Sequence, residues 1–101
     1  MSERTWENTY NLSDAQLEQL ESAETLMERM DLSGAERVLL SMLEDDSKCI
    51  PVLSNLGYLY GKHLSEFENA VEYYDRVLEI EPDNAWARDA RRRYSRYLNR
   101  D

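Results

Sequence analysis

Few side chains in this 101-residue chain are of the kinds that carry out covalent or metal chemistry. The one histidine, His63, falls in a predicted turn. The one cysteine, Cys49, has no second thiol and no matching histidine in its sequence context, so neither a metal pair nor an activated nucleophile is indicated. The acidic run at residues 44–46 lacks the ligand spacing of a calcium loop. We therefore expect no catalytic residue, no metal site, no cofactor and no small-molecule substrate.

A column of arginines near the C-terminal end is the sharpest charged feature. Arg88, Arg92 and Arg96 are spaced four residues apart, so on a helix they share one face. This basic face could meet nucleic acid, an acidic lipid surface or an acidic protein, or it could be solvated and favourable near a helix C-terminus. Residues 1–85 carry a net charge of −13 and residues 86–101 one of +4. Because the acidic body would repel phosphate, nucleic acid ranks last among these partners.

The composition is that of one small globular domain, with 42% apolar and 33% charged residues. No run approaches the roughly 18 apolar residues that span a bilayer, and no signal-peptide core follows Met1. A single cysteine indicates a reducing, cytoplasmic location. Three glycines and two prolines leave little room for the many turns of a small β-protein, so we expect helices.

Helix-start signals divide the chain. The patterns "SDAQ", "SGAE" and "SEFE" predict capped starts after Ser13, Ser33 and Ser65, because in a capping box the serine accepts from the N3 amide. Pro51 favours a first helical turn, and Pro82 a stop followed by an Asp/Asn cap. These signals predict five helices, about 14–30, 34–45, 51–62, 66–80 and 84–98.

Each predicted helix has an apolar stripe, which the last helix forms from Trp86, Ala90, Tyr94 and Leu98. The first helix is expected to continue its stripe as far as Met30. Residues 1–12 lack a clear period and are expected to form a loose arm, although Trp6, Tyr10 and Leu12 could dock on the first helix.

Two segments repeat. Residues 32–47 and 67–82 share a large apolar residue, an alanine three residues on and a bulky residue seven residues on, at an offset of 35. This pattern resembles the tetratricopeptide repeat family. The second unit has the family's residues in order: Leu56, Gly57, Tyr60, Phe67, Ala70, Tyr74 and Pro82. The first unit fits at Ala23, Leu26, Leu32, Ala35, Leu39 and Met42, but departs from the pattern at Ser22 and Ser47.

The resemblance implies an all-α superhelix of two antiparallel helix-turn-helix repeats, about 16–49 and 50–84, with a C-terminal capping helix at about 84–98. Residues 13–99 would form one domain. Gly57 would lie where the two helices of the second repeat cross, and close packing would offset its cost of about 1 kcal/mol in helix propensity. Gly61, near the predicted helix end, would help to terminate the helix.

The resemblance also implies a peptide-binding groove along the first helix of each repeat. Its residues would be Leu20, Glu24, Met27, Ser54, Asn55, Tyr58 and Lys62, although some could pack under the arm or the last helix. One variant of the family clamps a terminal carboxylate of chaperone tails. Of that clamp the chain keeps Asn55, whereas Leu20, Glu24 and Ala90 occupy positions of its other residues, so we do not expect chaperone-tail binding.

The expected function is non-catalytic binding of a protein or peptide, as a small adaptor, scaffold or assembly factor. Glu24 and the acidic surroundings favour a partner segment with some positive charge. Two alternatives stay open. The basic C-terminal helix could mediate self-association, for example as a homodimer, or the arginine face could bind an acidic partner or nucleic acid.

Overall fold

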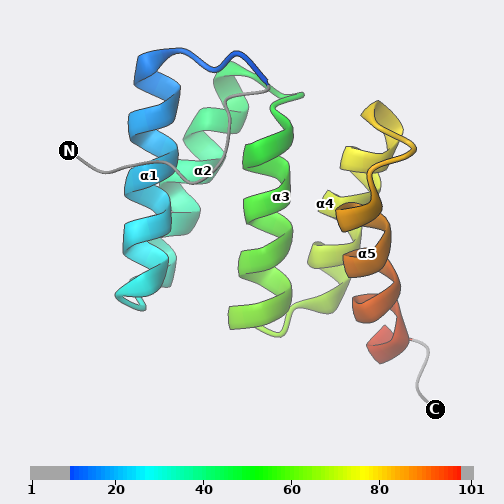
Figure 1. Cartoon of the computed structure of the whole chain (residues 1–101). Coiled ribbons are helices and arrows are strands. Elements are labelled where there is room, and N and C mark those ends of the chain that lie inside the picture. Colours follow the sequence, from blue (N-terminus) through cyan, green and yellow to red (C-terminus); the bar gives the residue numbers. More distant parts are fainter. Residues whose placement is uncertain (1–9, 99–101) are drawn as a thin grey trace.

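The computed structural model describes residues 10–98, and this part of the chain is built from helices (Figure 1). They are α1 (Asp14–Glu28), α2 (Leu32–Asp45), α3 (Ile50–Tyr58), η1 (Leu59–His63), α4 (Phe67–Ile80) and α5 (Ala85–Leu98). The short segment η1 is a turn of π-helix that continues α3. Helix α1 packs on α2, α3 on α4 and α4 on α5, each pair antiparallel. The predicted all-α fold is confirmed.

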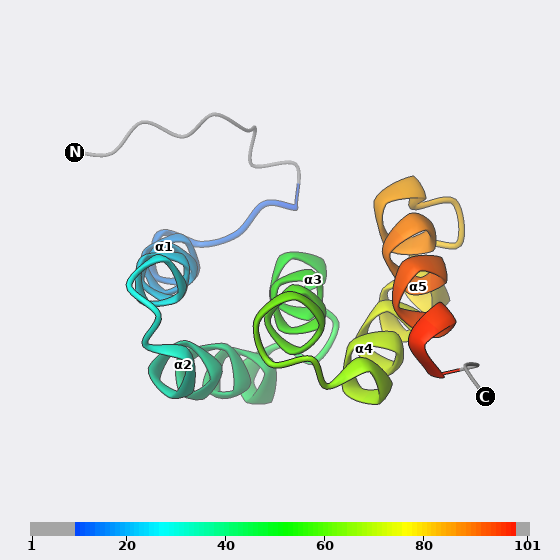
Figure 2. The same cartoon turned by 90° about the horizontal axis from the view of Figure 1, so that it is seen from below.

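The helices form two layers, which Figure 2 shows end on. Helices α1, α3 and α5 lie in one layer, and α2 and α4 lie in the other. The first repeat (α1 and α2) and the second repeat (α3, η1 and α4) therefore follow one another side by side, with α5 after them. No helix within residues 10–98 is long and apolar enough to cross a membrane.

Of the three serines predicted to cap a helix, one does so. Ser13 forms the predicted capping box, in which its hydroxyl accepts from the amide of Gln16. The prediction at Ser33 was wrong, because α2 starts earlier and Asp31 is its cap, accepting from the amide of Gly34 at 3.1 Å. The prediction at Ser65 was also wrong. Ser65 has a left-handed φ of 55°, and α4 begins without a side-chain cap.

Two glycines seat tyrosine rings in the core. A Cβ at Gly57 would lie 2.6 Å from the ring of Tyr74, so the predicted close packing of Gly57 is confirmed. A Cβ at Gly61 would lie 2.5 Å from the ring of Tyr94. Gly61 has no positive φ, lies within η1 and is buried, so the prediction that it ends the helix was wrong. Both glycines make room for aromatic side chains from α4 and α5.

The buried face of α5 differs from the predicted stripe. Ala87 and Tyr94, seven residues apart, are its buried side chains, whereas Trp86 is 88% exposed. The packing of the Tyr94 ring against Gly61 sets the rotation of α5 about its own axis. Trp86 then lies about one residue, roughly 100° around the helix, away from the buried face. The placement of Trp86 in the buried stripe was therefore wrong.

The segment before α1 is described only from Tyr10. Leu12 is buried in the core, and the Tyr10 hydroxyl donates to Glu81 Oε1 at 3.1 Å. Most of the predicted arm, Trp6 included, lies outside the described residues.

Candidate functional site

Two hollows that share Glu24 and Asn55 form a groove on the layer of α1, α3 and α5. The first, of about 310 Å³, is lined by Tyr10, Leu20, Glu24, Ile50, Pro51, Ser54, Asn55, Asn84 and Trp86. The second, of about 390 Å³, is lined by Glu24, Met27, Glu28, Met30, Asn55, Tyr58 and His63. Each is of a size that admits one or two side chains of a partner. We call the two hollows together the groove.

The structure brings together six of the seven predicted groove residues, which are Leu20, Glu24, Met27, Ser54, Asn55 and Tyr58. Leu20 and Met27 are buried and form its base. Tyr58 is 44% exposed, and its ring packs edge-to-face on His63 with 5.5 Å between centroids. Lys62 is exposed but lines neither hollow.

Sequence reasoning missed Met30 as a groove residue. Helix α1 ends at Glu28, and Met30 has a left-handed φ of 64°. The amide of Met30 donates to the carbonyl of Met27 and that of Asp31 to the carbonyl of Leu26, which is the Schellman arrangement usually completed by glycine. Met30 is therefore 63% exposed and lines the groove, not the apolar core.

Trp86 is the second residue that sequence reasoning missed. It lies at the start of α5, where Asn84 accepts from the amide of Ala87 at 3.0 Å. The Asn84 amide also donates to Glu81 Oε1 at 2.9 Å, and Tyr10 donates to the same oxygen. These bonds fix the backbone beside an indole that is itself exposed. No signal in the sequence placed this indole in the groove, because its position depends on how α5 rotates against α4.

Two carboxylates, Glu24 and Glu28, line the groove, and no lysine or arginine lines it. Burial raises the pKa of the Glu24 carboxyl, a hydrogen bond with Asn55 opposes that rise, and the nearby Glu21 and Glu28 add to it. Asn55 is itself held in place, since its amide donates to the carbonyl of Pro51 at 2.9 Å. The groove is thus an acidic surface with aromatic and thioether side chains.

The predicted basic face is also assembled. Arg88, Arg92 and Arg96 line a shallow hollow on the outer side of α4 and α5, together with Leu78, Arg91 and Ser95. Arg91 forms an ion pair with Asp75, and Arg88 donates to the carbonyl of Pro82 at 3.2 Å. All these arginines are exposed. A surface of this kind is well solvated, and each exposed contact contributes little.

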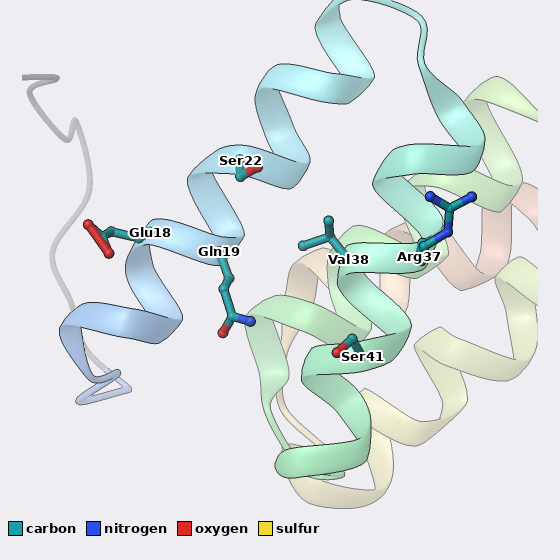
Figure 3. Close-up of a pocket in the computed structure, with 6 residues that line it drawn as sticks. All are labelled: Glu18, Gln19, Ser22, Arg37, Val38 and Ser41. Atoms are coloured by element: carbon teal, nitrogen blue, oxygen red, sulfur yellow. The ribbon is translucent and has the colours of Figure 1, made fainter.

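A further hollow lies between α1 and α2 (Figure 3). Gln19 and Ser22 of α1 and Val38 and Ser41 of α2 extend into it, while Glu18 points away from α2. It has no aromatic or thioether side chain that could anchor a partner. Within residues 10–98, no group of three or more His, Cys, Asp or Glu side chains is placed to hold a metal ion.

The family comparison agrees with this geometry. A model of the tetratricopeptide repeat family matches residues 50–84, which begin at the first residue of α3 and extend just past α4. None of the curated proteins matches the chain. Gly57, Ala70 and Tyr74, the residues on which the second repeat packs, all fall within the match. Residues 50–84, 35 of the 101 residues, therefore match a tetratricopeptide repeat.

Proposed function

We propose that the chain is a non-catalytic adaptor or assembly factor that binds a segment of a partner protein in its groove. The observation that carries this proposal is the groove itself, in which Tyr58, Met30 and Trp86 are exposed on a fixed backbone. Large aromatic and thioether side chains of this kind are typical anchors of protein interfaces. Tetratricopeptide repeats serve as protein-interaction modules, which supports the same function. A cytoplasmic location fits the free thiol of Cys49.

The test is selection of ligands from a phage library of random linear peptides on the immobilised chain. We expect enriched peptides that bind in solution, and we expect Tyr58→Ala and Met30→Gly to weaken them. Met30→Gly is the sharper variant, because glycine relieves the left-handed strain at this position and should stabilise the fold by about 1 kcal/mol. Equal affinity of both variants and the wild type would show that the groove is not the binding site.

The basic face supports a second candidate function, association with an acidic surface. Four arginines beside Leu78 form a hollow at one end of the array, whereas α1, at the other end, carries five acidic residues and no basic one. A second copy of the chain could supply the acidic surface. Light scattering at low and physiological salt tests this, since such an oligomer should dissociate as salt increases. A monomer under both conditions would exclude self-association.

A further inference from the structure

We infer that the segment bound in the groove presents a lysine or arginine to Glu24 and an adjacent apolar side chain to Trp86. This inference rests on the proposed function and specifies the chemistry of the partner.

The charge in the groove favours a cationic occupant. Glu24 and Glu28 line it, and no lysine or arginine is among its lining residues. Helix α1, which supplies both carboxylates, has no basic residue. An anionic segment would meet repulsion in both hollows, whereas a cation would be attracted to either.

Glu24 is the carboxylate best placed to receive the cation. It belongs to both hollows, so a side chain entering from either direction reaches it. It is half-buried and is held by Asn55, which is bonded to the carbonyl of Pro51. A carboxylate held in this way loses little conformational freedom when a cation binds, and partial burial strengthens the charge-assisted hydrogen bond.

Trp86 marks the place of the apolar neighbour. The indole lines the same hollow as Glu24, and it is exposed although the backbone that carries it is tied by Asn84. An exposed tryptophan on a rigid backbone offers a large contact area at low entropic cost. The aliphatic part of a lysine or arginine could also lie along this ring, so the two contacts reinforce one another.

The experiment is panning of the same random peptide library on the wild type, Glu24→Gln and Trp86→Ala in parallel. We expect wild-type peptides enriched in lysine or arginine next to an apolar residue, and loss of the basic residue from the peptides selected on Glu24→Gln. Glu18→Gln is the matched control, because Glu18 lies on the same helix but outside the groove. Thermal unfolding of each variant verifies that it is folded.

The strongest wild-type peptide is then synthesised with lysine and with norleucine at the basic position. We expect about a tenfold loss of affinity for the norleucine peptide, and a similar loss for the lysine peptide on Glu24→Gln. The norleucine peptide on Glu24→Gln should lose little more affinity than either change causes alone, because both changes remove the same contact. Trp86→Ala should weaken both peptides.

The outcomes separate this inference from the proposed function. Peptides that lack basic residues but depend on Tyr58 would overturn the inference and leave the proposed function intact. Basic peptides that bind the wild type and Glu24→Gln with equal affinity would also overturn it. Such peptides would be attracted by the overall negative charge of the protein and not by Glu24. Absence of any groove-dependent peptide would overturn both. If the chain instead forms an oligomer that both Glu24→Gln and Arg88/Arg92/Arg96→Gln abolish, the occupant is α5 of a second copy and the inferred partner segment is wrong.

Discussion

The two repeats obtain their stability in different ways. In the first repeat both helices have side-chain caps, from Ser13 on α1 and Asp31 on α2. In the second repeat neither α3 nor α4 has one. It has instead the two glycines that seat tyrosine rings, Gly57 and Gly61. The first repeat thus relies more on local hydrogen bonds, and the second more on contacts between helices.

Equivalent positions show how the crossing of the two helices is filled. The offsets of 34 in the first helix and 35 in the second place Ala23 and Leu39 of the first repeat at the positions of Gly57 and Tyr74 in the second. All four residues are buried. A tyrosine on one helix therefore accompanies glycine on the other, and a leucine accompanies alanine. The small residue is matched to the size of its neighbour.

The largest expected effect tests the packing of the second repeat. Gly57→Val should lower the free energy of unfolding by about 3 kcal/mol, because the ring of Tyr74 lies where the new side chain must go. Tyr74 cannot move freely, since it stacks on Tyr94 with 6.2 Å between centroids. Urea denaturation measures the loss. Gly34→Val is the control, because the nearest atoms there belong to the exposed carboxylate of Asp31, and displacing it should cost no more than the cap of α2, about 1 kcal/mol. Equal losses in the two variants would contradict the packing argument.

A double-mutant cycle tests whether the pairs are interchangeable. Gly57→Ala should cost about 1 kcal/mol, because overpacking exceeds the gain in helix propensity, and Tyr74→Leu should cost about 2 kcal/mol. The double variant recreates the pair found in the first repeat. We expect it to be more stable than the sum of the two losses predicts, by about 1 kcal/mol. Strict additivity in urea denaturation would show that the two residues do not share one space.

The sequence was sufficient for the fold because its strongest signals are periodic. Start and stop signals predicted five helices, each with an apolar stripe, and the residues of the second unit, from Leu56 to Pro82, predicted how two of them pack. Gly57 was interpreted correctly because its place in the repeat implies a crossing. Gly61 has no such place, and its role depends on Tyr94, thirty-three residues later, so local rules for helix ends gave the wrong answer.

The groove was predictable in part for the same reason. Six of its residues follow from their positions in the repeat. Met30 and Trp86 do not, because one depends on a Schellman ending that lacks glycine and the other on the rotation of α5. The serine caps were the least predictable feature, since Ser13 caps α1 but Ser33 and Ser65 cap no helix, whereas the cap predicted after Pro82 is present at Asn84.

A hydrogen bond between the repeats provides the next test. The hydroxyl of Tyr60 in η1 donates to Glu36 Oε2 of α2 at 2.6 Å. Tyr60→Phe should lower the free energy of unfolding by about 1.5 kcal/mol, because the bond is to a carboxylate and is partly buried. Tyr58→Phe, whose ring is exposed, is the control and should change stability by less than about 0.5 kcal/mol. Similar values for the two variants would show that the bond does not join the repeats.

The same bond predicts a pH dependence. Burial and the Glu36 carboxylate raise the pKa of the Tyr60 phenol, and burial also raises that of Tyr74. The folded protein keeps these phenols protonated where the unfolded chain ionises, so their contribution is complete below about pH 10 and is lost as pH rises toward the folded values. Urea denaturation at increasing alkaline pH should show falling stability, with a smaller fall in Tyr60→Phe. A wild-type curve that does not fall above this pH would contradict the expectation.

The smallest expected effects test the caps of the first repeat. Ser13→Ala should cost about 1 kcal/mol, because both the hydroxyl and Gln16 take part in the capping box. Ser33→Ala and Ser65→Ala should each cost less than about 0.5 kcal/mol, since neither serine caps a helix although each stands in the same sequence pattern. Thermal unfolding of the three variants ranks them. Equal losses at the three serines would mean that the capping box of Ser13 adds no stability, and the difference between the repeats would then rest on the Asp31 cap and on the packing of Gly57 and Gly61 against tyrosine rings.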